Sequence, residues 1–351
     1  MDPFVINLPK ITVLMPVYNC ELYVCEAIDS VLGQSFSDFE FLIIDDASSD
    51  STVSLIKSYN DSRIQLIEKP INTGYTNSLN YGLKIAKGKY IARMDGDDIS
   101  LQERFVKQVS FLEANPDIIL CGSWYSIIGS ERIEKVPEKH DQIKLAFLKG
   151  NCIAHPSVMM RKQSLDLFSI IYDVAKEPAE DYDLWVRLMS KGKLHNLQEV
   201  LLDYRTHSKQ VSNRQSVEQR NRVIEIRNSV FNFLELELLP EERLVFDKVI
   251  NNGIGINFND ISVFQKIQMK LLLSNPRDFF EPVGFKKEML ELEKVVIHYY
   301  FLKRRSFTAK IYFEYLKIKK ALHFKFDRNT ELKIAVKSLI FYKPLRFKIR
   351  F

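Results

Sequence analysis

The sequence contains no apolar run of about 18 residues, the length that a membrane-spanning helix needs. Its first residues also lack the basic region and the small-residue cleavage site of a secretory signal peptide. Cysteine is scarce, and the cysteines and histidines do not have the spacing of a zinc site. We therefore expect a cytosolic protein with four reduced cysteines, namely Cys20, Cys25, Cys121 and Cys152.

Two common phosphate-binding loops are also missing. No Gly-x-Gly-x-x-Gly motif follows the first predicted strand, and no Gly-x-x-x-x-Gly-Lys-Ser/Thr motif occurs. These absences argue against a Rossmann dehydrogenase and a P-loop NTPase. Residues 16–20 stand where a nucleotidyltransferase would carry a glycine-rich loop with arginine or lysine, so this class is also disfavoured.

Length and composition indicate a globular protein of two units. The chain has 351 residues, of which 46% are hydrophobic and 27% charged, whereas one domain usually holds about 100–200 residues. Its net charge of +5 is unevenly distributed, because residues 303–351 hold fifteen lysines and arginines and only three acids. The first 302 residues therefore carry a net charge of −7, and we expect the two parts to meet different partners.

The first third of the chain alternates between strand-like and helix-like segments. Short apolar runs predict strands, and segments with apolar residues on one helical face predict helices between them. This alternation predicts a mainly parallel sheet with helices on both faces, and such sheets bind ligands beyond the carboxyl ends of their strands. The predicted strands are residues 11–15, 39–44, 64–68 and 90–94, and the predicted helices include 51–59, 76–86 and 102–113.

Beyond about residue 217 the sequence is almost entirely helical. The predicted helices are residues 217–236, 241–251, 263–273, 286–303, 308–322 and 331–341. We place the domain boundary near residue 213, which gives an α/β domain of residues 1–213 and a helical region of residues 214–351. The end of this helical region combines basic and aromatic residues.

The strongest chemical signal is the acidic run of Asp95, Asp97 and Asp98 after the fourth strand. Carboxylates this close repel one another, and burial raises the free-energy cost of charging them unless a cation is present. Mg²⁺ or Mn²⁺ commonly bridges such carboxylates to substrate phosphates. The alternative is a solvated acidic loop that caps the following helix.

Polar residues also follow the first two strands. Asp45 and Asp46 could bind ribose hydroxyls or accept a hydrogen bond from a base, although the segment is equally suited to a turn. Tyr18, beside Asn19, could stack on a base. Because the carboxyl ends of these strands meet at one edge, the pattern predicts one crevice that receives all of these groups.

A third acidic group lies at residues 180–185. Acidic residues precede an apolar run here, as at the start of a helix, so we expect Asp183 to cap that helix. Glu180 or Asp181 could instead act as the general base for an acceptor hydroxyl. Further along, Arg205 or His207 could approach a diphosphate or a metal ion, although each is more often structural.

These motifs together resemble glycosyltransferase family 2, a family of inverting enzymes with the GT-A fold. The resemblance extends from about residue 9 to residue 207, and each motif occurs in the expected order. The motifs are residues 11–19, 28–35, 41–50, 72–74, 92–98 and 180–185. The glutamine-arginine-tryptophan motif and transmembrane helices of processive members are absent, so the resemblance implies an enzyme that adds a single sugar.

The resemblance implies a role for each matching residue. The first motif, through Pro16, Tyr18 and Asn19, would line the site of a nucleotide-sugar donor, with Tyr18 stacked on the base. Asp46 would contact uracil with Asp45 nearby, which favours a UDP-sugar. The other implied roles are Asp95 near the ribose or the metal shell, Asp97 or Asp98 as ligand of Mn²⁺ or Mg²⁺, His207 near the diphosphate and Asp181 as catalytic base.

The basic end of the chain predicts a separate surface. Lysines and arginines alternate there with aromatic residues, a combination that suits an anionic membrane. We expect a peripheral enzyme at the inner face of the plasma membrane, with a glycan or lipid-linked glycan of surface polysaccharide or lipopolysaccharide as acceptor. Ordinary helical packing with a charged outer face is the alternative, and nucleic acid is disfavoured because the rest of the chain is acidic. An inactive GT-A domain that serves as a binding partner is the second functional hypothesis.

Overall fold

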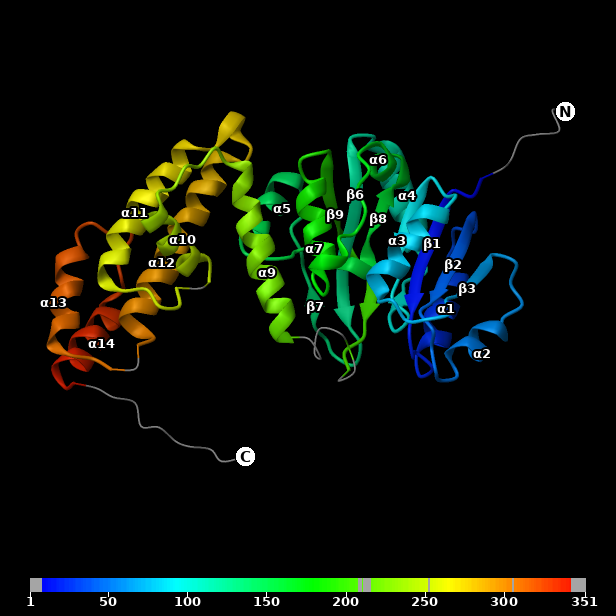
Figure 1. The fold of residues 1–351 in the computed structure, drawn as a ribbon, viewed down its shortest axis with the longest axis horizontal. Helices are drawn as coiled ribbons and strands as arrows, with labels where there is room; N and C mark the ends of the chain where they lie inside the picture. Colours follow the sequence, from blue (N-terminus) through cyan, green and yellow to red (C-terminus); the bar gives the residue numbers. More distant parts are fainter. Residues whose placement is uncertain (1–7, 208–209, 211–215, 252, 305, 342–351) are drawn as a thin grey trace. The chain divides into compact units, whose positions relative to one another are not determined.

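The computed structural model describes residues 8–207, 210, 216–251, 253–304 and 306–341. The chain forms two compact units, Met1–Ile226 and Arg227–Phe351. The first unit is a mixed α/β structure and the second is helical, so the predicted fold class is confirmed (Figure 1). The predicted domain boundary near residue 213 lies outside the described residues.

One sheet extends through the described part of the first unit. Its strand order is β3-β2-β1-β4-β8-β6-β9-β5, with β7 paired to β6. The first four of these strands are mutually parallel, as the alternation of strands and helices predicted. The strands are β1 (Ile11–Val17), β2 (Phe39–Asp45), β3 (Ile64–Glu68), β4 (Tyr90–Arg93), β5 (Ile99–Ser100), β6 (Ile118–Ile127), β7 (Ile133–Glu134), β8 (Met159–Arg161) and β9 (Lys193–Tyr204).

The second half of the sheet is mixed. Strand β8 runs antiparallel to both β4 and β6, whereas β6 and β9 are parallel. Strand β9 also pairs antiparallel with the short strand β5, which directly follows the acidic run. The residues after β9 therefore lie close to residues 95–98.

Helices cover both faces of the sheet. Successive side chains of the central strand β1 point to opposite faces, so both faces need to be covered. Val13 and Met15 belong to a core that includes the buried residues of α1 and α4. Leu14 points to the other face, where its side chain contacts Gly82 of α3. The helices of this unit are α1 (Val24–Leu32), α2 (Thr52–Lys57), α3 (Tyr75–Ile85), α4 (Arg104–Ala114), α5 (His140–Phe147), α6 (Lys162–Leu167), α7 (Glu180–Leu188) and α9 (Ser216–Val230), which continues into the second unit.

The turn between α3 and β4 lies directly against β1. The backbone N–H of Gly88 donates a hydrogen bond of 2.8 Å to the Thr12 hydroxyl. A Cβ atom on Gly88 would lie only 2.2 Å from the backbone nitrogen of Thr12. Only glycine fits this close approach of two backbone segments.

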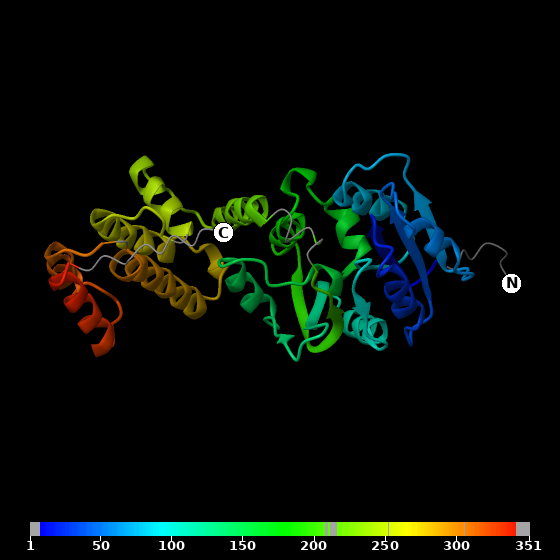
Figure 2. The same ribbon diagram turned by 90° about the horizontal axis from the view of Figure 1, so that it is seen from below.

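The second unit is a group of packed helices, seen from two directions in Figures 1 and 2. Aromatic side chains fill much of its core, among them Phe246, Phe264, Phe280 and Phe301, all fully buried. In the described residues, no helix is long and apolar enough to cross a membrane. The helices are α10 (Pro240–Ile250), α11 (Phe258–Leu273), α12 (Pro282–Leu302), α13 (Ala309–Ile318) and α14 (Arg328–Leu339).

Candidate active site

Three polar segments leave the sheet at the carboxyl ends of β1, β2 and β4. These strands are parallel neighbours, and Val17 lies beside Asp45 in the register of β1 and β2. The carbonyl of Val17 accepts a hydrogen bond of 2.9 Å from the backbone of Asp46. Segments 18–19, 45–46 and 95–98 therefore lie along one border of the sheet, which we call the carboxyl edge.

The loop after β1 presents an aromatic side chain and is tied to the loop after β2. Tyr18 is 47% exposed, so part of its ring is accessible to a ligand. Asn19 has a positive φ of 52°, a conformation that asparagine tolerates well. Its backbone donates to the Ser48 hydroxyl at 3.0 Å, and its side-chain oxygen accepts from the backbone of Ser49 at 2.8 Å. Pro16 is buried within β1.

Asp45 and Asp46 are both buried, yet their surroundings differ. Asp46 accepts hydrogen bonds from the backbone of Thr73 at 3.1 Å and of Gly74 at 2.8 Å, and forms an ion pair with Lys69 at 2.5 Å. Asp45 accepts a bond of 3.0 Å from the backbone of Ser48 through one oxygen. Its other oxygen, Oδ1, is buried and has no hydrogen-bond partner among the described residues.

The run after β4 folds into a compact acidic cluster. One carboxylate oxygen from each of Asp95, Asp97 and Asp98 lies within 4.8 Å of the others. Asp98 is almost fully buried, and its Oδ2 finds no hydrogen-bond partner in the part of the chain that the structure describes. Three carboxylates therefore converge, and Asp98 among them has a buried oxygen without a hydrogen-bond partner in the described residues. Such an arrangement fits a divalent cation of the Mg²⁺ or Mn²⁺ type.

Burial and mutual repulsion disfavour the charged forms of this cluster. Burial raises the pKa of Asp98 well above its ordinary value, and the charges of Asp95 and Asp97 raise it further. The pKa of Asp97 is also raised by burial and by Asp95, although the hydrogen bond from His207 opposes the shift. A divalent cation would favour the charged forms and reverse both shifts.

The segment after β9 closes over the acidic cluster. The backbone of Arg205 donates to Oδ1 of Asp98 at 2.8 Å, and its Nε donates to the backbone carbonyl of Asp97 at 2.7 Å. Its guanidinium also bonds Glu26 at 2.8 Å and covers the ring of Tyr23. Nε2 of His207 lies 2.9 Å from Oδ2 of Asp97. The structure thus joins His207 to a cluster 110 residues away in the sequence.

The candidate base lies in the first turn of α7. Asp181 accepts hydrogen bonds of 2.7 Å from the amide of Asn151 and from the backbone of Tyr182. Its neighbour Glu180 is more deeply buried, and one of its oxygens accepts a bond of 2.7 Å from the Tyr75 hydroxyl. Burial raises the pKa of both acids, to about 6 for Asp181 and to about 8 for Glu180, whose shift also includes the charge of Asp181.

The prediction that Asp183 caps this helix is wrong. Helix α7 begins at Glu180, and its N-cap residue is Ala179, whose side chain makes no capping bond. Asp183 lies inside the helix and forms an ion pair of 2.7 Å with Arg187 one turn later. The i,i+4 spacing of this pair was visible in the sequence and favours the helix interior.

Several residues that hold the site residues in place were not among the predicted site residues. Lys69 and Asn151 hold Asp46 and Asp181, and Tyr75 holds Glu180. Arg93, at the end of β4, is buried and forms an ion pair with Asp95. The position of Arg93 two residues before the acidic run was a usable signal, because a buried strand rarely ends in arginine without a partner. The other three depend on contacts between distant segments.

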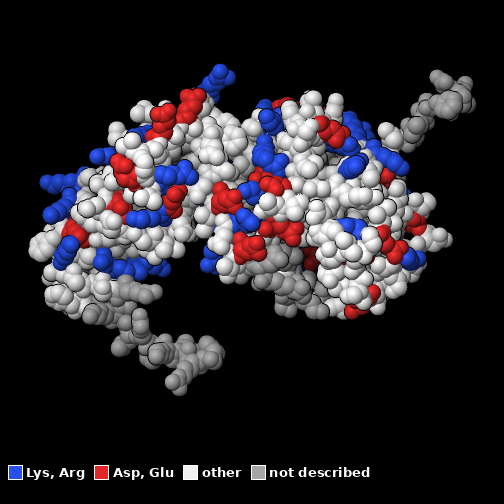
Figure 3. Space-filling view, viewed as in Figure 1, with Lys and Arg blue, Asp and Glu red and all other residues white. Residues whose placement is uncertain are grey.

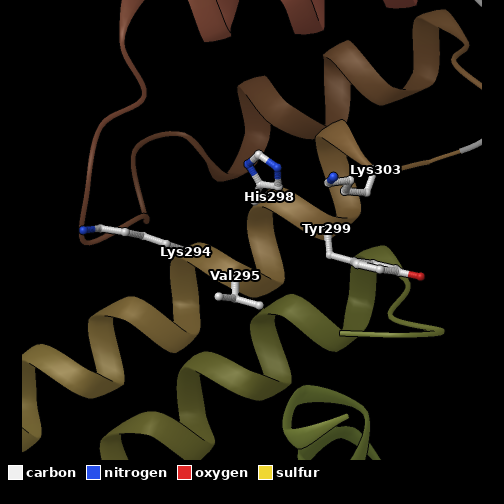
Figure 4. A pocket seen from close by; sticks show the side chains of 5 residues that line it. All are labelled: Lys294, Val295, His298, Tyr299 and Lys303. Carbon is white, nitrogen blue, oxygen red and sulfur yellow. The ribbon is translucent and has the colours of Figure 1, made fainter. Parts of the chain in front are cut away.

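Two surface pockets among the described residues lie away from the carboxyl edge. One, of about 360 Å³, lies along α12 in the second unit and is lined by Lys294, Val295, His298, Tyr299 and Lys303 (Figure 4). The other, of about 480 Å³, is lined by residues of the α3–β4 turn and of α6. Neither contains a residue of the acidic cluster or of the Asp181 group.

The mixed sheet with helices on both faces is that of GT-A glycosyltransferases. A family model described as "Glycosyl transferase family 2" matches residues 12–168. An uncharacterized glycosyltransferase of Haemophilus influenzae is 35% identical over 235 residues, which cover 63% of this chain and 73% of that protein. The chain belongs to glycosyl transferase family 2, and the predicted resemblance is confirmed.

A relative with a more specific name is WfaP of Escherichia coli. It is described as a UDP-Glc:alpha-D-GlcNAc-diphosphoundecaprenol beta-1,3-glucosyltransferase. It is 33% identical over 204 residues, which cover 58% of this chain and 79% of WfaP.

Solved structures share the fold. TarS of Staphylococcus aureus, residues 1–349 in complex with UDP-GlcNAc, superposes with a TM-score of 0.56 at 16% identity, covering 83% of this chain and 91% of that one. The mannosyltransferase PcManGT of Pyrobaculum calidifontis, in complex with GDP-Man and Mn²⁺, gives a TM-score of 0.52 at 13% identity. The match covers 85% of this chain and 88% of PcManGT.

Proposed function

We propose that this glycosyltransferase moves one sugar from a nucleotide-sugar donor, with UDP as the favoured nucleotide, to a lipid-linked glycan acceptor. The observation that carries the proposal is the cluster of Asp95, Asp97 and Asp98. In this cluster the buried Oδ2 of Asp98 has no hydrogen-bond partner among the described residues. The donor diphosphate and its cation are the ligands that such a cluster suits.

The donor nucleotide binds at the carboxyl edge in this proposal. Tyr18 offers an exposed aromatic face for the base. Asp45 has an open, buried oxygen that can accept a hydrogen bond from the base or the ribose, and Asp46 holds the adjacent loop at Thr73 and Gly74. Pro16 and Asn19 fix the backbone around Tyr18. The relative WfaP uses UDP-Glc by its name, which favours UDP.

Asp97 and Asp98 hold the divalent cation, with Asp95 beside them. A bound Mn²⁺ or Mg²⁺ supplies Lewis-acid stabilisation of the charge that develops on the leaving nucleotide. His207 positions Asp97 through their contact of 2.9 Å and offers a polar group to the diphosphate. The fold neighbour PcManGT, which contains Mn²⁺, supports a cation of this type.

Asp181 is the general base. It accepts the proton of the acceptor hydroxyl while that oxygen attacks the anomeric carbon opposite the leaving group, so one displacement inverts the configuration. Its raised pKa brings it close to neutral pH, where a base is most effective, and Asn151 holds its carboxylate in place.

The proposed acceptor is a lipid-linked glycan, and the name of a relative supports it. The name of WfaP includes a sugar on a diphosphoundecaprenol carrier, and a carrier of this kind would bring the reaction to a membrane surface. A peripheral enzyme on the cytoplasmic side of the plasma membrane suits such an acceptor. The sugar transferred is either a hexose or an N-acetylhexosamine.

A thermal-shift screen tests the donor site directly. UDP, GDP, CDP and dTDP are each measured with and without Mn²⁺, because a ligand that binds the folded state raises its apparent stability by RT ln(1 + [L]/Kd). We expect UDP with Mn²⁺ to raise the melting temperature most. If no nucleotide changes the melting temperature, the chain is better explained as an inactive GT-A domain that acts as a binding partner.

A further inference from the structure

Helix α14 exposes apolar residues on the side opposite its buried one. One side carries Ile334 and Ser338, which are fully buried within the second unit. The other carries four aliphatic side chains at i, i+4, i+7 and i+8, a spacing that places them on one helical face. These residues, which we call the α14 stripe, are Leu332, Val336, Leu339 and Ile340, and each is 45–64% exposed.

Helix α13, which packs against α14, repeats this arrangement on a smaller scale. The Tyr315 hydroxyl donates a hydrogen bond of 2.7 Å to Glu331, which joins the two helices. Ile311 and Tyr315 are buried on the packed side of α13, whereas Phe313 and Leu316 are exposed on the opposite side. Both helices therefore expose apolar side chains on the side opposite their buried residues.

The region of the chain that contains α13 and α14 is strongly positive. Residues 303–341 include eleven lysines and arginines but only three acids. All three acids are engaged: Glu314 with the Tyr300 hydroxyl, Asp327 with the backbone of Thr330, and Glu331 with Tyr315. Figure 3 shows blue lysine and arginine side chains predominating near α13 and α14, at the left end of the view. The exposed lysines of residues 303–341 are Lys303, Lys310, Lys317, Lys319, Lys320, Lys325 and Lys333.

We propose that the α14 stripe docks on an anionic phospholipid surface and inserts its aliphatic side chains among the lipid head groups. Aliphatic residues flanked by lysines are the combination that binds an interfacial helix to anionic lipid. A second copy of the chain is a poorer occupant, because a two-fold interface would bring the same lysines together. Nucleic acid also fits less well, because aliphatic side chains neither stack on bases nor bond phosphates.

The inference rests on the proposed function only for its purpose, which is to bring the enzyme to a lipid-linked acceptor. It adds a specific set of residues to the general expectation that the basic end of the chain meets a membrane. Residues 342–351, which contain four more basic residues, lie outside the described residues and are not needed for it.

The test is co-sedimentation of the full-length protein with vesicles of phosphatidylcholine, with and without phosphatidylglycerol. The double variant Leu332→Ser/Leu339→Ser removes two of the four aliphatic side chains of the α14 stripe. We expect it to reduce partitioning to anionic vesicles at least about tenfold. The matched control, Met269→Ser/Leu273→Ser, changes two residues on α11 that are as exposed as those of the stripe, and should bind like the wild type.

A second pair of measurements tests the electrostatic part. Lys317→Glu/Lys333→Glu should weaken binding to anionic vesicles, and high salt should weaken binding of the wild type. The inference is overturned if the wild type ignores anionic vesicles at low salt, or if the stripe variant binds as the wild type does. It is equally overturned if the α11 control loses as much binding, or if the stripe variant instead converts a dimer to a monomer or abolishes RNA binding.

The vesicle assay contains neither a nucleotide nor an acceptor, so it is independent of the proposed catalytic function. The same preparations are examined for stabilisation by UDP with Mn²⁺. Loss of nucleotide binding with normal vesicle binding would refute the proposed function alone. Normal nucleotide binding without vesicle binding would refute the docking surface alone.

Discussion

Adjacent acids at the start of α7 have different surroundings. Glu180 is buried and accepts a hydrogen bond from the Tyr75 hydroxyl, and burial together with the charge of Asp181 raises its pKa. The pKa of Asp181, which is more exposed, is raised less, so the ionised form is favoured on Asp181 over Glu180. The residue pattern alone did not separate them, because both are acids at the same helix terminus, and only the family resemblance favoured Asp181.

We predict that Asp181→Asn lowers the transfer rate about 10²–10⁴-fold, since this is the usual contribution of a general base. The measurement is kcat with a saturating donor, together with donor affinity, which should stay within about threefold because Asp181 has no role in the proposed nucleotide site. The matched variant Glu180→Gln preserves the neutral form and should cost less than about tenfold in kcat. The opposite ranking would assign the base to Glu180.

The raised pKa of Asp181 also predicts the pH dependence of the reaction. A base must be deprotonated, so kcat/KM should fall as the pH decreases through about 6, where Asp181 takes up a proton. An unperturbed aspartate would give this fall near pH 4. The measurement is the pH profile of kcat/KM. A profile that is flat between pH 7 and about 5 would contradict the assignment of Asp181 as the base.

Asp98 offers a test of the cation site that does not depend on turnover. Asp98→Asn keeps an oxygen that can accept the hydrogen bond from Arg205 but removes a buried charge next to Asp95 and Asp97. We expect the ligand-free melting temperature to stay the same or rise, because this repulsion is relieved. The affinity for Mn²⁺ in the presence of UDP should fall at least about tenfold, measured by titration calorimetry. Unchanged Mn²⁺ affinity would remove Asp98 from the proposed ligands.

The backbone of the turn between α3 and β4 lies directly against β1 at Gly88. Gly88→Ala would place its Cβ 2.2 Å from the backbone of Thr12, and a backbone atom cannot move aside as a side chain can. We expect a loss of about 1–3 kcal/mol in the free energy of unfolding, measured by urea denaturation. The neighbouring variant Lys87→Ala, at an exposed side chain, should stay within about 0.5 kcal/mol.

Most elements were predictable from local patterns, but some helix starts were not. Two helices are predicted to begin at residues 263 and 286, whereas α11 begins at Phe258 and α12 at Pro282. Asn257 and Asp260 form a capping box before α11, and Glu281 caps α12 with proline next to it. These residues are polar or helix-breaking, so an apolar periodicity overlooks them although their capping chemistry is readable.

The whole molecule contains two compact units with separate cores. The residues of the proposed nucleotide site, from Tyr18 to His207, all belong to the first unit. Phe264 is fully buried in the second, and Phe264→Ala should destabilise that unit by about 3–5 kcal/mol. Calorimetry should show the transition of the second unit at a lower temperature, with the stabilisation of the first by UDP and Mn²⁺ preserved. Loss of that stabilisation would show that nucleotide binding depends on the helical unit.

Hydrophobic patterning along the chain was enough to predict the parallel half of the sheet, the helices that cover it and the helical second unit. It also placed Asp45, Asp46 and Asp95 at strand ends, because burial has a period that each segment displays on its own. The motifs were enough to predict the family, which the comparisons confirm.

Other features required the tertiary structure, because they depend on which distant segments become neighbours. The insertion of β8 between β4 and β6, and the pairing of β9 with β5, bring Arg205 and His207 to the acidic cluster. Strand order of this kind is set by the packing of the whole sheet, so the local periodicity of each segment does not predict it. The same holds for α14, because its local pattern does not reveal that Ile334 and Ser338 are covered while Leu332, Val336 and Leu339 are exposed.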